Sequence, residues 1–393
     1  MNKNILNTGI QEFIHEKLHT DIVSVLLKKP IFNSISNREL AEQLEARKKC
    51  ENKLPTWFKT KKIYYPNKLN IEQTSSEITA RYKAEIVSGK SLLDVTGGLG
   101  VDSYFFSKKI DQVYHCEVDK NLSRIAAYNF DVLGVKNIKS NTTDGLEFLK
   151  SSETLFDWVY LDPSRRDDNK KRVFLLSDCS PNILENLDLF FSKTENVLIK
   201  TAPLLDLSLG IKQLNFVKEI HVVAVDNDVK ELLWILKKNY ESSVQIKTIN
   251  FSKNNNQTFD FVLKEEEKAR PTYSEPLSYL YELNSAILKS GGFKLISARL
   301  NLKKLHEHTH LYTSNELQEF LGRIFKIEKI LPYTKKEIRR LGIKKANVKT
   351  RNFPEKVEAI RRKFGINDGG STYLFFTKDH KNNKIVIICL KHK

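Results

Sequence analysis

The stretch that most constrains the fold is an apolar run that ends at an acid and then turns through three glycines. Residues 91–95 form the apolar run, with Asp94 near its end, and the turn Thr96-Gly97-Gly98-Leu99-Gly100 follows. Glycine reaches positive φ at little cost and has no Cβ to hold a ligand away from the backbone. The pattern predicts a buried strand, a tight turn at its carboxyl end and a helix from about Val101, with a ligand close to the turn.

Short β-rich runs alternate with helical patterns from about residue 86. The runs are 92–95, 112–118, 158–161, 197–200, 221–225 and 232–236. Alternation of strand and helix favours a mainly parallel sheet with helices on both faces. In such folds the ligand binds at the carboxyl edge of the sheet.

The segments before and after this sheet differ from it. Residues 1–65 carry apolar positions at three- and four-residue spacing, and Ser36 three residues before Glu39 predicts a capped helix start. Prolines at 271 and 276 mark a linker. The chain then ends in two strand-like runs, 372–376 and 384–389.

Positive charge is concentrated near the C-terminal end. The 393 residues include 65 Lys+Arg and 48 Asp+Glu, which gives a net charge of +17. Residues 319–393 hold 20 Lys and Arg against 7 Asp and Glu, so a surplus of 13 lies in the last fifth of the chain. Such a surplus favours a polyanionic partner, nucleic acid before a membrane surface, over a merely soluble basic surface.

Several protein classes are disfavoured by what the sequence lacks. It has no run of about 18 apolar residues that would span a membrane, and its first 17 residues lack the apolar block of a signal peptide. The cysteines, at positions 50, 116, 179 and 389, have no paired spacing, which argues against a disulfide framework or a zinc site. We therefore expect a cytoplasmic protein without a bound metal.

Two kinds of cofactor use a glycine turn after the first strand of such a sheet. A dinucleotide site needs Gly-x-Gly-x-x-Gly, and here Gly98-x-Gly100-x-x-Ser103 has serine at the third place. Asp94-x-Thr96-Gly97-x-x-Gly100 instead resembles the first motif of class I S-adenosylmethionine (SAM) methyltransferases. In that family the turn faces the amino-acid end of the cofactor, and the leading acid, here Asp94, contributes to the site facing the methionine ammonium. The later strands decide between the two.

The next two strands also lead into acids. Glu117 ends the predicted second strand, with Asp119 beside it, and an acid there can accept hydrogen bonds from a ribose diol; a solvated loop acid is the alternative. Asp144 follows a predicted third strand, at a place that resembles the methyltransferase loop whose Asp accepts a hydrogen bond from the adenine amino group. A helix N-cap for residues 145–150 explains Asp144 equally well.

The predicted fourth strand runs directly into Asp162-Pro163-Ser164-Arg165-Arg166. This resembles the [Asp/Asn/Ser]-Pro-Pro-aromatic segment of class I methyltransferases that act on exocyclic amines. There a carboxylate and a backbone carbonyl accept the N–H hydrogens of the amine and return electron density to its nitrogen, so positioning and electrostatics suffice without a metal. Ser164 replaces the second proline and Arg165 the aromatic residue; arginine can stack on a base or hold a phosphate. A structural reading, in which Asp162 only caps a turn, is the alternative.

Residues 200–203 follow the predicted fifth strand and are candidates to border the target pocket; an ordinary loop between strand and helix is the alternative. Further stretches match a narrower group of proteins: 72–77, 281–291, 310–314, 351–354 and 368–370. On these motifs the chain resembles a bacterial family of class I SAM-dependent methyltransferases with ferredoxin-like and THUMP-like domains at the C-terminal end. The resemblance implies an α/β fold with a Rossmann-like class I methyltransferase sheet, an N-terminal helical region and C-terminal α+β domains.

The implied boundaries are 1–65 for the helical region, 66–270 for the SAM-dependent methyltransferase domain, 271–317 for the ferredoxin-like domain and 318–393 for the basic THUMP-like domain. The resemblance assigns catalysis to Asp162, Pro163, Ser164 and Arg165. It assigns cofactor binding to Gln73, Ser75, Ser76, Asp94, Thr96, Gly97, Gly98, Gly100, Asp102, Glu117, Asp119, Asp144 and Asp162. Ordinary helix capping is the alternative for Gln73, Ser75 and Ser76.

THUMP domains are associated with RNA-modifying enzymes, which agrees with the charge surplus found independently. The residues expected to hold RNA phosphates are Lys344, Lys345, Lys349, Arg351, Arg361 and Arg362. Phe353 is a candidate stacking platform, although a phenylalanine there is more often a core residue. The predicted function is SAM-dependent methylation of a base nitrogen in ribosomal or transfer RNA. The alternatives are methylation of a protein or small molecule, a non-catalytic RNA-binding protein that keeps the SAM fold and, more distantly, a dinucleotide oxidoreductase.

Overall fold

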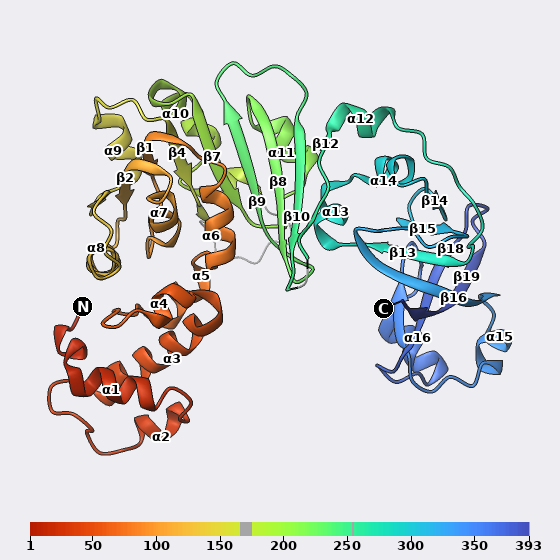
Figure 1. Ribbon diagram of the computed structural model, residues 1–393, viewed down its shortest axis with the longest axis horizontal. Coiled ribbons are helices and arrows are strands. Elements are labelled where there is room, and N and C mark those ends of the chain that lie inside the picture. Colours follow the sequence, from red (N-terminus) through yellow and green to blue (C-terminus); the bar gives the residue numbers. More distant parts are fainter. Residues whose placement is uncertain (166–174, 254, 393) are drawn as a thin grey trace. The chain divides into compact units, whose positions relative to one another are not determined.

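The computed structural model describes residues 1–165, 175–253 and 255–392 (Figure 1). The chain divides into two compact units. The first comprises Met1–Val217 and Trp234–Tyr240, and the second Lys218–Leu233 and Glu241–Lys393. This division does not follow the boundaries predicted at residues 65, 270 and 317, which stay predictions.

Short helices open the first unit. They are η1 (Lys3–Leu6), α1 (Thr8–Glu16), α2 (Ile22–Leu26), α3 (Asn37–Lys53), α4 (Pro55–Lys59), α5 (Lys68–Gln73) and α6 (Glu77–Ala84). The predicted cap of α3 is confirmed. The hydroxyl of Ser36 accepts a hydrogen bond from the Glu39 N–H at 3.2 Å, and the Glu39 carboxylate accepts one from the Ser36 N–H at 3.0 Å.

These helices pack onto the sheet of the same unit. The buried Trp57 ring lies edge-on to Tyr104 of α7 (Val101–Phe106), with centroids 4.9 Å apart. Asn129 donates to the Tyr64 carbonyl at 2.9 Å, and the Tyr64 N–H donates to Asn129 Oδ1 at 3.0 Å. The N-terminal helical region therefore shares a core with the sheet that follows it.

The sheet of the first unit has the strand order β9-β7-β4-β1-β2-β3, where β9 (Asp228–Lys237) contributes its second half, and the pairings from β7 to β3 are all parallel. The strands of this unit are β1 (Gly89–Asp94), β2 (Ile110–Cys116), β3 (Ile138–Asn141), β4 (Trp158–Leu161) and β7 (Asn196–Thr201), with the short pair β5 (Ser164–Arg165) and β6 (Cys179–Ser180). The helices after α7 are α8 (Lys120–Val132), α9 (Gly145–Ser151), η2 (Leu176–Asp178), η3 (Leu184–Asn186), α10 (Leu187–Lys193) and α11 (Leu207–Gln213). All four residues of β4 are buried, as a strand covered on both faces requires. Parallel pairing brings the carboxyl ends of β1, β4 and β7 to one edge.

The second unit holds the C-terminal strands. It contains β8 (Val217–Val225), the first half of β9 (Asp228–Lys237), β10 (Gln245–Phe251), β11 (Gln257–Thr258), β12 (Phe261–Val262), β13 (Tyr279–Leu283), β14 (Lys303–Lys304), β15 (Leu311–Ser314), β16 (Gly322–Pro332), β17 (Asn347–Thr350), β18 (Thr372–Lys378) and β19 (Lys384–Lys391). Its helices are α12 (Leu263–Lys268), α13 (Ser285–Ser290), α14 (Phe293–Arg299), α15 (Lys335–Arg340) and α16 (Val357–Phe364). The strands from β13 onward form one sheet in the order β14-β15-β13-β16-β19-β18-β17, in which only β17 and β18 pair in parallel.

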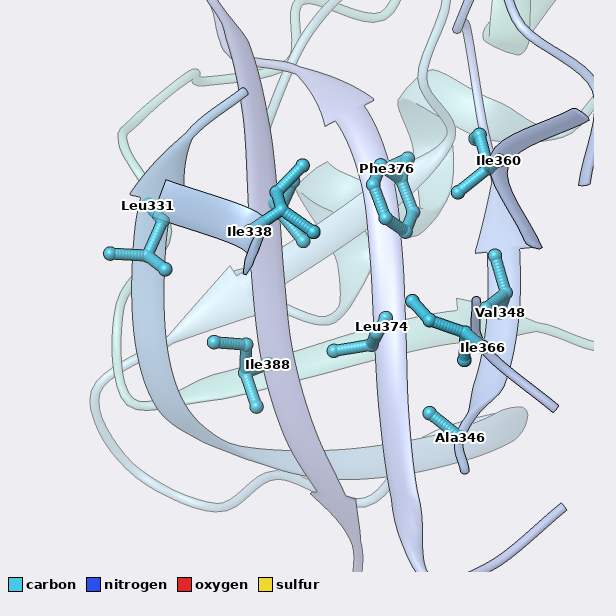
Figure 2. Close-up of a cluster of buried hydrophobic side chains, with 10 residues drawn as sticks. Leu331, Ile338, Ala346, Val348, Ile360, Ile366, Leu374, Phe376 and Ile388 are labelled. Carbon is cyan, nitrogen blue, oxygen red and sulfur yellow. The ribbon is translucent and has the colours of Figure 1, made fainter. Parts of the chain in front are cut away.

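Both faces of this seven-stranded sheet carry a hydrophobic core. Leu374 and Phe376 point to the face covered by α15 and α16, where they pack with Ile338 and Ile360 (Figure 2). Phe375, between them in β18, points to the opposite face and packs with the second cluster. This alternation follows from the two-residue period of a strand, and burial on both faces explains why 373–376 is continuously apolar in sequence.

The sheet is strongly curled. Four strand spacings separate β13 from β17, which in a flat sheet would be about 19 Å. Yet the Lys349 ammonium and the Arg351 guanidinium from the β17 edge both contact the carboxylate of Glu282 on β13, Arg351 at 2.8 Å. A register shift between Ile327 and Lys329 in β16 marks a bulge, which increases the local twist.

No helix within the described residues is long and apolar enough to cross a membrane.

We predict that Glu282→Gln destabilises the protein by about 2 kcal/mol. Glu282 is 3 % exposed, and its loss would leave Lys349, Arg351 and Arg323 without their shared counter-charge. The cost stays below the roughly 3–5 kcal/mol of a fully buried pair because the cations keep some contact with water. Urea unfolding of the full chain measures the change.

The matched control is Glu275→Gln. Glu275 pairs with Lys381 at 3.1 Å, but both side chains are about half exposed or more, so we expect a loss of less than about 1 kcal/mol. Equal losses in the two variants would contradict a structural role for the Glu282 cluster.

Candidate functional site

A polar cavity of about 800 Å³ lies at the carboxyl edge of the first unit's sheet. Most of the residues predicted from sequence line it. These are Gln73, Ser75, Asp94, Thr96, Gly97, Gly98, Asp102, Glu117, Asp144, Asp162, Pro163 and Ser164. Ser76, Gly100 and Asp119 are not among the lining residues.

The three residues that do not line the cavity have structural contacts that explain why a residue of that type occurs at each position. Ser76 caps α6 by accepting from the Thr79 N–H at 3.3 Å. Asp119 caps α8 by accepting from the N–H groups of Asn121 and Leu122 at 2.7 and 3.0 Å. Gly100 precedes α7 with φ +79°, and a Cβ built there would lie 2.2 Å from the Phe130 ring. Their predicted part in cofactor binding stays a prediction.

The glycine turn is closed over a buried histidine that sequence reasoning missed. A Cβ built on Gly97 would lie 2.3 Å from the imidazole of His115, so only glycine fits above this ring. His115 Nε2 lies 3.3 Å from the Gly98 carbonyl oxygen and Nδ1 lies 3.3 Å from the Ser140 hydroxyl. Burial lowers the pKa of His115 to about 4, so the ring is neutral at neutral pH.

Asp94 ends β1, and its carboxylate is hydrogen-bonded to the glycine turn and to α7. Its carboxylate accepts hydrogen bonds from the Thr96 N–H at 3.1 Å and from the Ser103 hydroxyl at 2.6 Å. Asp94 is 1 % exposed, and burial, reinforced by the neighbouring Asp102 and Asp162 carboxylates, raises its pKa to about 8. The serine at the third motif position therefore donates a hydrogen bond to this carboxylate.

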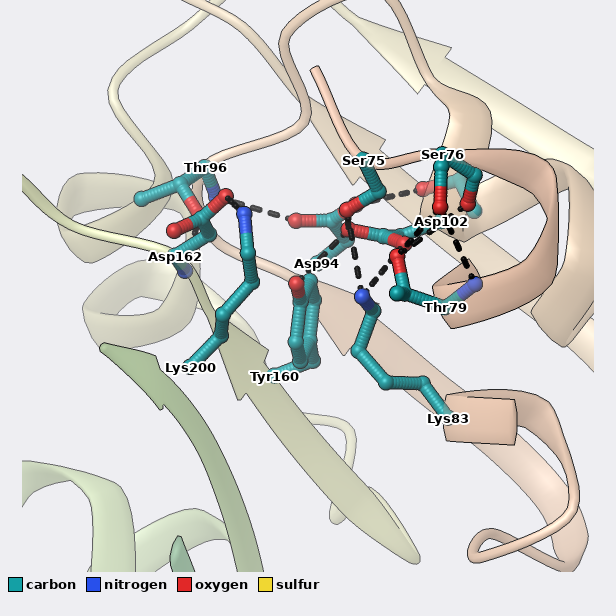
Figure 3. A network of polar contacts seen from close by, with 11 residues as sticks. Ser75, Ser76, Thr79, Lys83, Asp94, Thr96, Asp102, Tyr160, Asp162 and Lys200 are labelled. Atoms are coloured by element: carbon teal, nitrogen blue, oxygen red, sulfur yellow. Dashed lines mark hydrogen bonds and ion pairs between the residues drawn. The ribbon is translucent and has the colours of Figure 1, made fainter. Parts of the chain in front are cut away.

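Asp102, in the first turn of α7, is the centre of a second buried network (Figure 3). Its Oδ2 accepts hydrogen bonds from the Ser75 hydroxyl at 2.8 Å and the Tyr160 hydroxyl at 2.7 Å. The Lys83 ammonium, fully buried in α6, lies 3.2 Å from Oδ1. Burial alone would raise the pKa of Asp102, but Lys83, Lys200 and the two hydroxyls outweigh it and lower the pKa. Asp102 therefore stays ionised where Asp94 does not.

Neither Lys83 nor Tyr160 was predicted as a site residue. Lys83 lies in α6, whose sequence mixes polar and apolar residues without a clear pattern, so nothing marks this lysine as buried. Tyr160 is one of four strand-forming residues in β4 and looks like an ordinary core residue. The signal that could have found Tyr160 is its position two residues before Asp162, which places its side chain on the same face of the strand.

Asp162 follows β4 and forms an ion pair with Lys200 of β7 (Figure 3). Its backbone N–H donates to the Thr96 hydroxyl at 2.7 Å, which ties the strand end to the glycine turn. The side chains of Asp162 and Lys200 are 32 % and 14 % exposed, and both residues line the cavity. Of the residues 200–203 expected at the target pocket, Lys200 lines the cavity and the other three do not, so their part in binding a target stays a prediction.

The two residues after Pro163 form the short strand β5, which pairs antiparallel with β6. Ser164 in β5 pairs with Ser180 in β6, and Pro163 and Ser164 line the cavity. For Arg165 the structure describes the backbone, which pairs with Cys179. Arg166 lies outside the described residues.

Two further acids lie on the neighbouring strand ends. Glu117 accepts from the Gly98 N–H at 2.9 Å and from the Asp119 N–H at 2.7 Å, one bond on each carboxylate oxygen. A carboxylate has about four acceptor sites, so this leaves room for two ligand hydroxyls. Asp144 caps α9 by accepting from the Leu146 N–H at 2.8 Å and also lines the cavity, so both interpretations of this residue fit its position.

The predicted RNA-binding residues fall into two groups. Lys349 and Arg351 contact Glu282, and Arg361 contacts the carboxylate of Asp368. The exposed members are Lys344, Lys345 and Arg362. Phe353 packs partly buried against the α16 face of the sheet, 4.9 Å from the Tyr333 ring, as a core residue would.

A parallel sheet in the order β7-β4-β1-β2-β3, with a polar cavity at its carboxyl edge, defines a Rossmann-like α/β protein with the fold of class I methyltransferases. Models of a THUMP domain-like family and of a ferredoxin-like domain match residues 322–391 and 279–320. A protein from Porphyromonas gingivalis W83, described as a candidate methyltransferase, is 30 % identical with a TM-score of 0.87, covering 100 % of this chain and 99 % of that one. The chain therefore belongs to the family of class I SAM-dependent methyltransferases with ferredoxin-like and THUMP-like C-terminal domains.

Other solved structures are much less similar. TrmK of M. capricolum, in complex with S-adenosylhomocysteine, is 21 % identical with a TM-score of 0.33, over 42 % of this chain and 69 % of that one. An rRNA methylase from Streptococcus thermophilus is 15 % identical with a TM-score of 0.31, over 41 % and 94 %. Nothing about the ligand or substrate of this chain follows from similarity at that level. No curated protein matches the sequence.

We predict that Asp94→Asn changes how stability depends on pH. The pKa of Asp94 rises from 3.8 to about 8 on folding, so between these values the folded chain holds a proton that the unfolded chain has lost. This contribution to stability is complete below about pH 4 and is lost as the pH rises toward 8. The variant lacks it, so its stability relative to the natural protein should rise with pH by up to about 1.4 kcal/mol per pH unit.

Urea unfolding of both proteins from pH 5 to pH 9 measures this difference. The asparagine can satisfy only one of the two donors on Asp94, so the variant should be less stable at acid pH, and the slope carries the prediction. Parallel stability curves would contradict the buried, proton-holding state of Asp94.

Proposed function

We propose that this protein is a SAM-dependent methyltransferase that methylates a base nitrogen in RNA and acts in the cytoplasm. The observation that carries the catalytic part is Asp162. Its carboxylate lines the same cavity as the glycine turn, its backbone is tied to that turn through Thr96, and its side chain is within reach of solvent. A carboxylate in this position can take a proton from a nitrogen as that nitrogen is methylated.

The cavity suits the cofactor. When bound, SAM supplies a methyl group on a positively charged sulfur. Glu117, with two acceptor sites left at the tip of β2, would hold the ribose hydroxyls, and Asp144 would lie near the adenine. Asp102, which stays ionised while the pKa of Asp94 is raised, would supply negative charge near the methionine ammonium without binding it directly, because both its oxygens already have partners. Gly97 and Gly98 let the backbone approach.

RNA is favoured as the substrate by the second unit. The surplus of 13 positive charges in residues 319–393 coincides with the THUMP-like match at 322–391. Phosphate contacts supply most of the sequence-independent affinity for nucleic acids. All four cysteines are free and buried, which agrees with a reducing compartment.

Asp162→Asn tests the catalytic assignment. We expect methyl transfer to fall by about 10²- to 10⁴-fold, because the amide cannot accept the proton. The rise in melting temperature that SAM or S-adenosylhomocysteine causes should largely persist, because Asp162 is one of many residues expected to contact the cofactor and the others, among them Gly97, Gly98 and Glu117, are unchanged. NAD should cause no rise in either protein.

The assay is transfer of label from SAM to total RNA of a strain that lacks the gene. Label in RNA with the natural protein and its loss with Asp162→Asn would support the proposal. An unchanged rate would remove Asp162 from catalysis, and label in protein instead of RNA would favour the other substrate class.

Lys344→Glu/Lys345→Glu/Arg362→Glu tests the RNA-binding residues in the intact chain. Deleting residues 319–393 would cut the sheet of the second unit between β15 and β16, so it cannot isolate binding from folding. We expect the slope of log affinity against log salt to fall by about 0.7–0.9 for each RNA phosphate that the variant no longer neutralises.

The control carries the same charge change in the first unit: Lys28→Glu/Lys29→Glu/Lys48→Glu, all three exposed. It should leave the salt slope nearly unchanged. Equal effects of the two variants would mean that overall charge, and not this surface, binds the RNA.

A further inference from the structure

The ion pair between Asp162 and Lys200 restricts which nitrogen the site can methylate. Residues Leu161 of β4 and Ile199 of β7 are direct partners in the parallel register, so Asp162 and Lys200 each come one residue later on adjacent strands. Their side chains meet in the cavity, where a carboxylate acceptor and an ammonium donor stand side by side. A base that reaches Asp162 therefore also meets Lys200.

An exocyclic amine is a poor match for this pair. Its lone pair is delocalised into the ring, toward the neighbouring ring nitrogen. An ammonium that donates a hydrogen bond to that ring nitrogen would draw the lone pair further away from the amine, which is the opposite of what methyl transfer needs. The absence of the second proline and of an aromatic residue at positions 164 and 165 agrees with this mismatch.

A lactam matches both groups. In guanine N1 and uracil N3 the N–H stands next to a ring carbonyl, and the nitrogen has no free lone pair until its proton leaves. As the proton leaves, negative charge develops on the carbonyl oxygen. A base on the N–H and a cation on the oxygen then both stabilise the transition state more than the ground state.

We propose that the acceptor is such a lactam nitrogen, guanine N1 or uracil N3, with Asp162 as the base and Lys200 as the donor to the carbonyl oxygen. This rests on the proposed function and names its substrate class. The bond between the ring nitrogen and the methyl carbon forms while the bond between that carbon and sulfur breaks. The sulfur keeps the electron pair, and the proton passes through Asp162 to water.

The product nucleoside tests the proposal without any variant. Total RNA from a strain lacking the gene is incubated with the protein and labelled SAM, then digested and analysed by mass spectrometry. We expect 1-methylguanosine or 3-methyluridine. N6-methyladenosine, N4-methylcytidine or N2-methylguanosine would overturn the lactam assignment and leave RNA methylation intact. No labelled nucleoside would overturn RNA methylation and the assignment with it.

Lys200→Met tests the role of the ammonium. The side chain keeps a similar length but loses the donor, so we expect the turnover number to fall by about 10²- to 10³-fold, as when an oxyanion donor is removed. The remaining rate should rise with pH, because hydroxide can then replace the missing stabilisation by deprotonating the lactam. The affinity for S-adenosylhomocysteine, measured by calorimetry, reports whether the cavity is intact.

Lys200→Arg keeps a positive donor and should retain more activity than Lys200→Met, with the pH profile of the natural protein. Lys109→Met is the matched control, because Lys109 forms a surface pair with Glu85 at 2.8 Å on the same unit. Lys109→Met should leave rate and pH profile unchanged. A Lys200→Met protein with the natural rate and pH profile would overturn the role of Lys200.

Discussion

The structure of the cavity wall depends on how two buried carboxyl groups avoid an uncompensated charge, one by holding a proton and the other by pairing with a lysine. Asp94 and Asp102 lie at opposite ends of the same glycine turn, yet burial raises the pKa of the first, while a buried lysine and two hydroxyls lower the pKa of the second. An uncompensated buried charge costs several kcal/mol, so each carboxylate fixes the groups that bind it. The groups that bind Asp102 come from α6, from β4 and from the residues just before α6. This carboxylate therefore links three segments of the chain into one wall of the cavity.

The second unit uses the same principle, again with a buried carboxylate at the centre. There one buried carboxylate, Glu282, gathers three cations from β16 and the β17 edge and holds the curled sheet together. Part of the positive charge that suggested a polyanionic partner is therefore neutralised inside the protein. Lys349 and Arg351 count toward the surplus of the sequence, but their charge is already opposed in the fold.

The sequence predicted local features well because their causes are local. The strand at 158–161 matches β4, the Ser36–Glu39 cap is present, and Asp94, Glu117 and Asp162 come to one edge because parallel strands bring their carboxyl ends together. It missed His115, Lys83 and the pairing of Lys200, because each acts through a partner that is distant in the chain, 17 residues away for His115 and 38 for Lys200. A histidine in a strand or a lysine in a helix has no signature that reveals such a partner.

The sequence by itself determined which chemical groups stand at the ends of the strands and where the glycines allow close approach. Those choices depend on φ, on the absence of a Cβ and on strand period, which are properties of neighbouring residues. Only the tertiary structure decided which carboxylate is ionised, which cations are already paired and which donor stands beside Asp162. Desolvation and Coulomb interactions depend on distances in space, and segments far apart in the chain set those distances.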